Sequence, residues 1–180
     1  MTAPEIKTLC SKIVYQNRWM TVREDAIERA DGTRGIYGVV EKPDFAIVAA
    51  VQDELIYLVQ QYRYPLAARF WELPQGSWAS GTGSAVDLAR TELREETGIS
   101  AQVMLHVARL HNAYGYSTQA VDVFLAKGLS LGEQDLEREE QGLVCRPFKV
   151  SEAVEMIRSG EITDAPTVAT FGILKLRALL

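Results

Sequence analysis

The stretch that decides the fold covers residues 73–99 and reads LPQGSWASGTGSAVDLARTELREETGI. Its second half predicts a helix, because Ser84 with an aspartate three residues later forms a capping box and Gly98 follows as a helix stop. Pro74 and the glycines before the helix predict a loop that comes from a strand ending near residues 71–72. A strand, a glycine-rich loop and a helix therefore follow one another.

The predicted helix carries three carboxylates, Glu92, Glu95 and Glu96, at i, i+3 and i+4. This spacing gathers them on one helical face, where like charges repel unless a cation neutralises them. A solvated charged face would place these acids opposite the apolar stripe. At about 100° per residue, however, Glu92 and Glu96 lie on the apolar side and Arg90 and Arg94 point away. The pattern favours a buried site for a divalent cation, with Mg²⁺ as the expected ion.

The glycine loop before this helix suits a phosphate group. Free backbone amides and the helix dipole favour an anion at a helix N-terminus. A metal held by the inward carboxylates would bridge to such an anion. The loop and the helix together therefore predict a metal-dependent site for a phosphate-containing ligand.

Composition limits the class of protein. A chain of 180 residues that is 47% hydrophobic can bury one core without disulfides. The formal charge of −5 argues against a general nucleic-acid binder. Cys10 and Cys145 lie far apart without metal-ligand spacing, and no signal or membrane-spanning pattern is present, so we expect a soluble cytoplasmic protein with no membrane partner.

Hydrophobic patterns predict a mixed α+β fold. An N-terminal antiparallel unit is expected from residues 11–29 and 34–41, joined around Asp31 and Gly32. The remaining strands are expected at 45–51, 55–62, 103–110, 120–126 and 143–148, and two further helices at 151–159 and 166–180. The polar, acidic stretch 129–142 is expected to be a mobile loop.

Residues 92–99, ELREETGI, resemble the second half of the signature of the Nudix hydrolases. The first half departs from that signature. Thr91 replaces an arginine, the loop is one residue longer, and Thr82 or Gly83 stands where the family has a glutamate. The resemblance implies an α/β/α sandwich with a mixed sheet, in which Glu92, Glu95, Glu96 and the carbonyl of Gln75 hold Mg²⁺, with Mn²⁺ as an alternative.

The flanking residues resemble the branch that hydrolyses ADP-ribose and nucleoside diphosphate sugars. The matching stretches are 60–65 (QQYRYP), 71–76 (WELPQG) and 160–167 (GEITDAPT). The stretch 112–117 (NAYGYS) instead resembles diadenosine polyphosphate hydrolases. The resemblance implies hydrolysis of a diphosphate linkage, with ADP-ribose as the leading substrate and dinucleoside polyphosphates as the alternative.

The same resemblance implies roles for residues outside the helix. The catalytic residues expected are Glu96 with Glu139 or Glu140 as the general base. Arg63 either binds substrate or pairs with Glu72. The full set of expected substrate contacts is Trp19, Arg63, Glu72, Gly76 and Tyr116, although packing is an alternative for the aromatic residues.

The resemblance also predicts the organisation of the chain. Residues 1–43 are expected to form N-terminal strands at a homodimer interface, and residues 44–180 the Nudix domain. A catalytically weak nucleotide-sugar sensor with the same fold is the alternative to an enzyme. The substitution Glu96→Gln should abolish turnover in an enzyme and alter little beyond metal affinity in a sensor.

Overall fold

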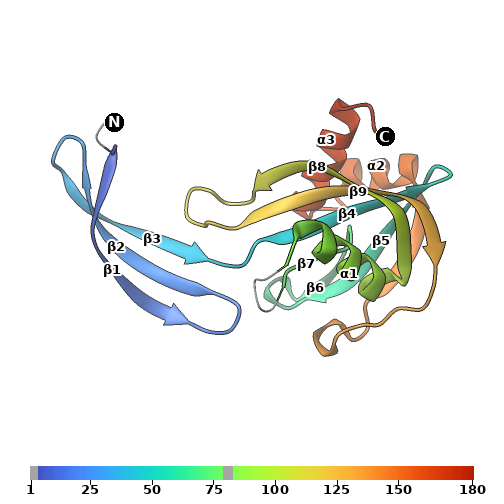
Figure 1. The fold of residues 1–180 in the computed structure, drawn as a ribbon, viewed down its shortest axis with the longest axis horizontal. Helices are drawn as coiled ribbons and strands as arrows, with labels where there is room; N and C mark the ends of the chain where they lie inside the picture. The colour runs from blue at the N-terminus through green and yellow to red at the C-terminus, as the bar shows by residue number, and fades with distance from the viewer. Residues whose placement is uncertain (1–3, 79–82) are drawn as a thin grey trace.

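A computed structural model describes residues 4–78 and 83–180 of the chain. They form two units, a three-stranded N-terminal sheet and a larger unit with helices on both faces of a mixed sheet. Figure 1 shows the N-terminal sheet projecting to the left of the larger unit, so the molecule is elongated.

The N-terminal sheet is an antiparallel meander of β1 (Ile6–Gln16), β2 (Thr21–Arg29) and β3 (Arg34–Glu41). The predicted single strand over residues 11–29 was wrong, because the chain turns at Asn17. The Asn17 side-chain oxygen accepts hydrogen bonds from the amides of Trp19 and Met20, at 2.9 Å each, and this satisfies the amides of a tight turn. The predicted turn at Asp31 and Gly32 is confirmed, with Gly32 at a positive φ of 82°.

The larger sheet contains β4 (Phe45–Gln52), β5 (Leu55–Arg63), β6 (Ala68–Glu72), β7 (Gln75–Gly76), β8 (Ile99–His111), β9 (Ala120–Leu131) and β10 (Val144–Lys149). The strand order is β10-β5-β4-β9-β8, with β6 beside β5 and β7 beside β4. Within the described part of this sheet, β4 and β9 form the parallel pair and the other paired strands are antiparallel. The hairpin β4–β5 pairs next to its turn, and its strands then separate so that β7 pairs with β4 and β6 with β5.

Three helices cover the two faces of this sheet: α1 (Ala85–Thr97), α2 (Val150–Ser159) and α3 (Ala165–Leu176). Successive residues of β4 alternate between two cores, as expected for a central strand buried on both faces. Ala46 and Val48 pack with Leu88 and Leu93 of α1. Ile47 and Ala49 belong to a second core that includes residues of α2 and α3. The predicted α/β/α sandwich with a mixed sheet is confirmed.

Several elements differ in length from the predictions. Strands β8 and β9 extend beyond 103–110 and 120–126, because their far ends pair with each other while carrying polar, exposed residues. The predicted loop 129–142 accordingly begins within β9 and contains a short 3₁₀ turn, η2 (Arg138–Glu140). Helix α3 ends at Leu176, before the expected residue 180.

Strand β3 joins the two units. The Val40 amide donates to the Tyr116 carbonyl at 2.8 Å, and the Thr118 amide donates to the Val40 carbonyl at 3.2 Å. The Tyr37 hydroxyl donates to the Gly115 carbonyl at 2.6 Å. The connection between β8 and β9 therefore anchors the N-terminal sheet.

Candidate active site

Helix α1 presents its acids as its sequence predicts. The Ser84 side chain caps the helix by accepting from the amide of Asp87, and Gly98 ends it with a φ of 72°. Glu92 is 9% exposed and Glu96 is 1% exposed. Both acids therefore face inward, where a cation, a proton or hydrogen bonds must offset the cost of their burial.

A third carboxylate reaches these two from the acidic loop, which we define as residues 132–141. One side-chain oxygen from each of Glu92, Glu96 and Glu140 lies within 4.8 Å of the others. The predicted metal ligand Glu95 is outside this group, and its carboxylate is 3.7 Å from the guanidinium of Arg94. The cluster thus combines two neighbours on α1 with one residue far away in the sequence.

The strand β7 shapes the cluster from its other side. The Gln75 amide donates to a carboxylate oxygen of Glu96 at 3.0 Å. Gly76 lies directly against Glu92, because a Cβ at this position would be 2.2 Å from Glu92 Oε2. Glycine therefore leaves the space that this carboxylate occupies.

Burial and mutual repulsion keep these acids from ionising freely. Burial raises the pKa of Glu92 to about 8, and the charges of Glu140, Glu95 and Glu137 contribute. Burial raises the pKa of Glu96 well above its ordinary value, with Glu92 and Glu140 adding to the effect. Such a cluster favours a proton or a divalent cation, and carboxylate oxygens are the ligands that Mg²⁺ and Mn²⁺ prefer. The residues present therefore fit a divalent metal.

Glu140 is held by the 3₁₀ turn η2. Its carboxylate accepts from the Glu137 amide at 3.0 Å, and the Glu137 side chain accepts from the Glu140 amide in return. This reciprocal capping box fixes the direction of Glu140. The side chain of Glu139, the other predicted base, lies outside the described residues, as does Thr82 of the glycine loop.

A cleft of about 570 Å³ opens beside the cluster and shares Gln75 and Gly76 with it. Three predicted substrate contacts, Arg63, Glu72 and Gly76, line this cleft. Arg63 and Glu72 also pair with each other, since the Arg63 guanidinium donates to Glu72 through Nε at 3.2 Å and through Nη2. Burial raises the pKa of Glu72, although Arg63 opposes the shift. Of the two roles predicted for Arg63, the structure therefore contains the ion pair with Glu72.

Sequence reasoning assigned no role to Asp164, which also lines the cleft. Asp164 caps α3 by accepting from the Thr167 amide at 2.9 Å and hydroxyl at 2.7 Å. It also accepts from Gln75 Nε2 at 3.2 Å, while the Leu73 amide donates to the buried Thr167 hydroxyl at 3.0 Å. These bonds connect α3 to β7 and to Leu73 just before it, beside the carboxylate cluster. The Asp164–Thr167 spacing is itself an N-cap signal.

The two aromatic residues expected near the substrate lie elsewhere in this chain. Trp19 is in the turn between β1 and β2 instead of on a strand, is 56% exposed, and has the Arg18 guanidinium 4.1 Å from its ring centre. Tyr116 is 59% exposed and contributes its backbone to the contact with β3. Neither lines the 570 Å³ cleft.

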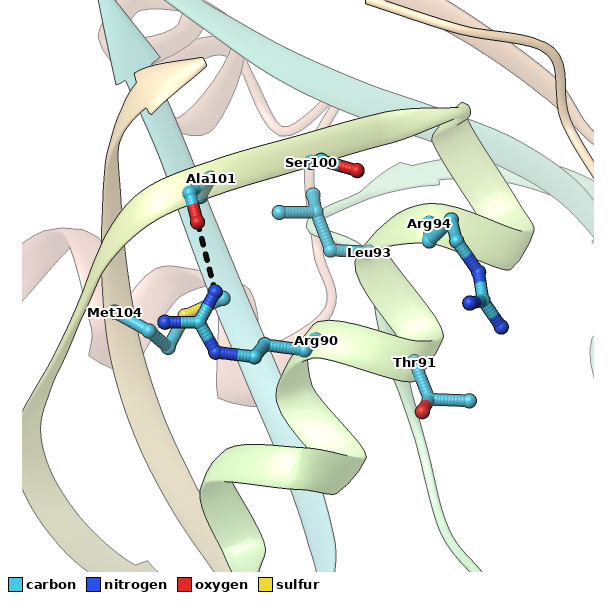
Figure 2. A pocket seen from close by; sticks show the side chains of 7 residues that line it. All are labelled: Arg90, Thr91, Leu93, Arg94, Ser100, Ala101 and Met104. Carbon is cyan, nitrogen blue, oxygen red and sulfur yellow. Dashed lines mark hydrogen bonds between the residues drawn. The ribbon is translucent and has the colours of Figure 1, made fainter. Parts of the chain in front are cut away.

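The opposite face of α1 has a separate, smaller cavity of about 180 Å³. Figure 2 shows Arg90 reaching from α1 to the Ala101 carbonyl on β8, a hydrogen bond of 2.7 Å. Thr91, which replaces the signature arginine, also lines this cavity. The basic and acidic faces of the helix thus serve different contacts, as its sequence predicts.

Comparison with known families fits this geometry. The model of the NUDIX domain matches residues 41–171. The chain belongs to the Nudix hydrolase family. A second model, the nucleoside diphosphate sugar hydrolase N-terminal domain, matches residues 6–40. The two models together cover both structural units, the second matching the N-terminal sheet and the first the larger unit.

Two of the similar curated proteins are named ADP-ribose pyrophosphatase. The ADP-ribose pyrophosphatase of Bacillus subtilis (strain 168) is 29% identical over 100% of this chain and 98% of its own length. That of Mycobacterium tuberculosis (strain ATCC 25618 / H37Rv) is 30% identical over 99% of this chain and 86% of its own. The methanol dehydrogenase activator of Bacillus methanolicus is 28% identical over 98% and 96%. This Nudix protein is therefore a pyrophosphohydrolase, as predicted.

A solved structure supports the fold. The crystal structure of an ADP compounds hydrolase has a TM-score of 0.84 at 18% identity, covering 97% of this Nudix chain and 95% of the other. Nudix enzymes use divalent metals, and the cluster of Glu92, Glu96 and Glu140 is compatible with one. Among the described residues, the helices are all too short or too polar to cross a membrane.

Proposed function

We propose that this enzyme hydrolyses the diphosphate linkage of a nucleoside diphosphate sugar in the presence of Mg²⁺, with ADP-ribose giving AMP and ribose 5-phosphate. One observation carries the proposal: the carboxylates of Glu92, Glu96 and Glu140 converge where Gly76 opens onto the cleft. A diphosphate placed at this junction has its metal ligands on one side and room for its sugar on the other.

The residues of the cluster take different roles. Glu92 and Glu96 would hold Mg²⁺ or Mn²⁺ together with Glu140, whose carboxylate lies in the same cluster, and Glu95 and the Gln75 carbonyl would add further ligands. A metal bound there would neutralise the charge of the diphosphate, so that water could approach its phosphorus. Glu140 accepts a proton from the attacking water while the new phosphorus–oxygen bond forms and the bridging bond breaks. The capping box with Glu137 supports Glu140 over Glu139 for this role.

The cleft supports a nucleotide-sugar substrate. Its volume falls within the range of about 300 to 1,000 Å³ that is typical of small-molecule sites. Phe45, Phe70 and Leu66 supply apolar walls, and Arg63 and Lys42 supply positive charge. Together with the relatives named ADP-ribose pyrophosphatase, this makes ADP-ribose the leading substrate. A cytoplasmic location is part of the same proposal.

A homodimer formed through residues 1–43 is the second part of the proposal. All described residues of β1 are exposed, so this strand packs against no other part of the described chain on either face. The sheet exposes large apolar side chains, namely Ile6, Leu9, Ile13, Val14, Tyr15, Ile36 and Tyr37. Exposed patches of this kind mark interaction sites. We propose that a second copy covers them, and that its Trp19 approaches the cleft of the first.

Product chromatography tests the reaction. The protein and Mg²⁺ are incubated with ADP-ribose, UDP-glucose, GDP-mannose and diadenosine polyphosphate, each with an EDTA control. We expect AMP and ribose 5-phosphate from ADP-ribose. Glu96→Gln should abolish this turnover, whereas the matched change Glu152→Gln on the exposed side of α2 should preserve it. If diadenosine polyphosphate were hydrolysed in preference to ADP-ribose, the assigned substrate would change to a dinucleoside polyphosphate. Unchanged turnover in Glu96→Gln would refute the assigned site.

Sedimentation tests the assembly. We expect a dimer that Ile13→Glu dissociates, because this change places a charge in the proposed apolar interface. The matched change Val168→Glu on exposed α3 should leave the dimer intact. A monomeric wild-type protein at micromolar concentration would refute this part of the proposal.

A further inference from the structure

The acidic loop is attached to the last turn of α1. The Asp135 amide donates to the Glu95 carbonyl at 3.0 Å, and the Gln134 side-chain amide donates to the Glu96 carbonyl. These carbonyls belong to the last turn of the helix, where no intrahelical donor is available to them. The loop therefore completes the C-terminal end of the helix that carries the metal ligands.

Close backbone packing brings the loop to this position. A Cβ at Gly98 would be 2.5 Å from the Gly132 carbonyl oxygen, so the loop starts in contact with the glycine that ends α1. At the other end, Arg69 donates to the Gly142 carbonyl at 2.6 Å. Both ends are thus fixed, and Gln134 is a loop side chain that bonds to α1 between them.

Charge opposes this attachment. The loop carries Asp135, Glu137 and Glu140 toward a helix that already has three glutamates. Burial raises the pKa of Glu95, and the carboxylates of Glu137, Glu140 and Asp135 raise it further. Like charges at this range repel, and the neutral hydrogen bonds from Asp135 and Gln134 to the helix oppose this repulsion.

We propose that Gln134 is a positioning residue of the reaction, which ties the acidic loop to the carbonyl of Glu96 so that Glu140 reaches Glu92 and Glu96. This inference rests on the proposed function of Glu140. The Gln134 side chain does not enter the cluster itself but donates to the backbone of Glu96, so its role is to hold the loop that carries Glu140. It is exposed, so replacing it should leave the fold intact.

The test removes the N–H donor of the Gln134 side chain while keeping a side chain of the same size. Gln134→Glu has no N–H to donate and places a carboxylate against a carbonyl, whereas Gln134→Lys restores a donor and suits the negative end of the helix. Gln141→Glu is the matched control, because it adds the same charge to the loop, while the Gln141 side chain donates only a long bond of 3.5 Å to the Glu137 carbonyl. Mn²⁺ binding is measured by electron paramagnetic resonance, and exchange of the Asp135 amide is measured without metal.

We expect Gln134→Glu to weaken Mn²⁺ binding about 5- to 10-fold, as loss of one hydrogen bond predicts, and to speed exchange at Asp135. Gln134→Lys and Gln141→Glu should stay within about twofold of the wild type. In the Glu140→Gln background, Gln134→Glu should change Mn²⁺ binding by less than about twofold, because the two residues act as one unit.

Other results would overturn the inference. Equal weakening by Gln134→Glu and Gln141→Glu would assign the effect to charge alone. Additive weakening by Gln134→Glu and Glu140→Gln would show that Gln134 does not act through Glu140. Both measurements need no substrate, so they stand even if the wild-type protein hydrolyses no nucleoside diphosphate sugar.

Discussion

Removing the metal should make stability depend on pH through Glu92. Its carboxyl has a pKa of about 8 in the folded protein, raised chiefly by burial, against 4.5 as the ordinary value. The folded state therefore holds this proton more tightly than the unfolded state. The resulting stability is fully present below about pH 4.5 and is lost as the pH rises toward about 8. Bound Mg²⁺ takes the place of the proton, so its stabilising effect should grow with pH.

The magnitude follows from the pKa of Glu92. A tenfold change in proton affinity is worth about 1.4 kcal/mol, so the rise from 4.5 to about 8 corresponds to about 5 kcal/mol. Between these limits, the free energy of unfolding of the metal-free protein should fall by about 1.4 kcal/mol per pH unit because of this group. Glu96, whose pKa is raised in the same direction, should steepen the fall.

Urea unfolding in EDTA, repeated across this pH range, measures the slope. Glu92→Gln removes the titrating group and should flatten the slope by about one proton, whereas exposed Glu152→Gln should leave it unchanged. Adding Mg²⁺ should raise the unfolding free energy strongly near pH 8 and little near about pH 5. A Glu92→Gln slope equal to that of the wild type would refute the reasoning, since Glu92 would then ionise alike in both states.

Two substitutions test the structure around the cluster. Gly76→Ala places a methyl group 2.2 Å from Glu92 Oε2. Metal affinity or turnover, measured by Mg²⁺ titration, should therefore fall at least about 10-fold. Gly38→Ala is the control, because a Cβ at Gly38 meets no atom within 4 Å. Asp164→Ala removes the α3 cap and the bond from Gln75, and should lower the free energy of unfolding by about 1 to 2 kcal/mol in urea titrations. Asp164→Asn keeps a hydrogen-bond acceptor, so its free energy of unfolding should fall less. Equal falls in the two variants would contradict the capping role of Asp164.

The sequence was sufficient to predict the local parts of the site. The inward face of α1 follows from the spacing of Glu92 and Glu96 relative to the apolar residues, which is a property of one helix. The pair of strands β4 and β5 follows likewise from two apolar runs flanking Asp53 and Glu54, both of which adopt positive φ.

Non-local contacts were beyond the reach of such patterns. The choice of Glu140 depends on the approach of its carboxylate to Glu92 and Glu96, and the contact of Gln134 with Glu96 depends on the close packing of Gly132 against Gly98. The turn at Asn17 was missed because residues that favour β-strands stand on both sides of it. In each case the geometry depends on particular contacts of side chains or backbone. The periodicity of apolar residues in the sequence does not predict such contacts.

The order of the strands has a consequence for synthesis of the chain. The N-terminal meander is made of neighbouring strands, so it can form as soon as Glu41 has left the ribosome. The central parallel pair must wait, because Phe45 pairs with Val121 and Ala50 with Ala126. In a nascent chain, the apolar N-terminal sheet is therefore exposed well before the active site can form. Chaperones or a second nascent chain can bind this sheet at that stage.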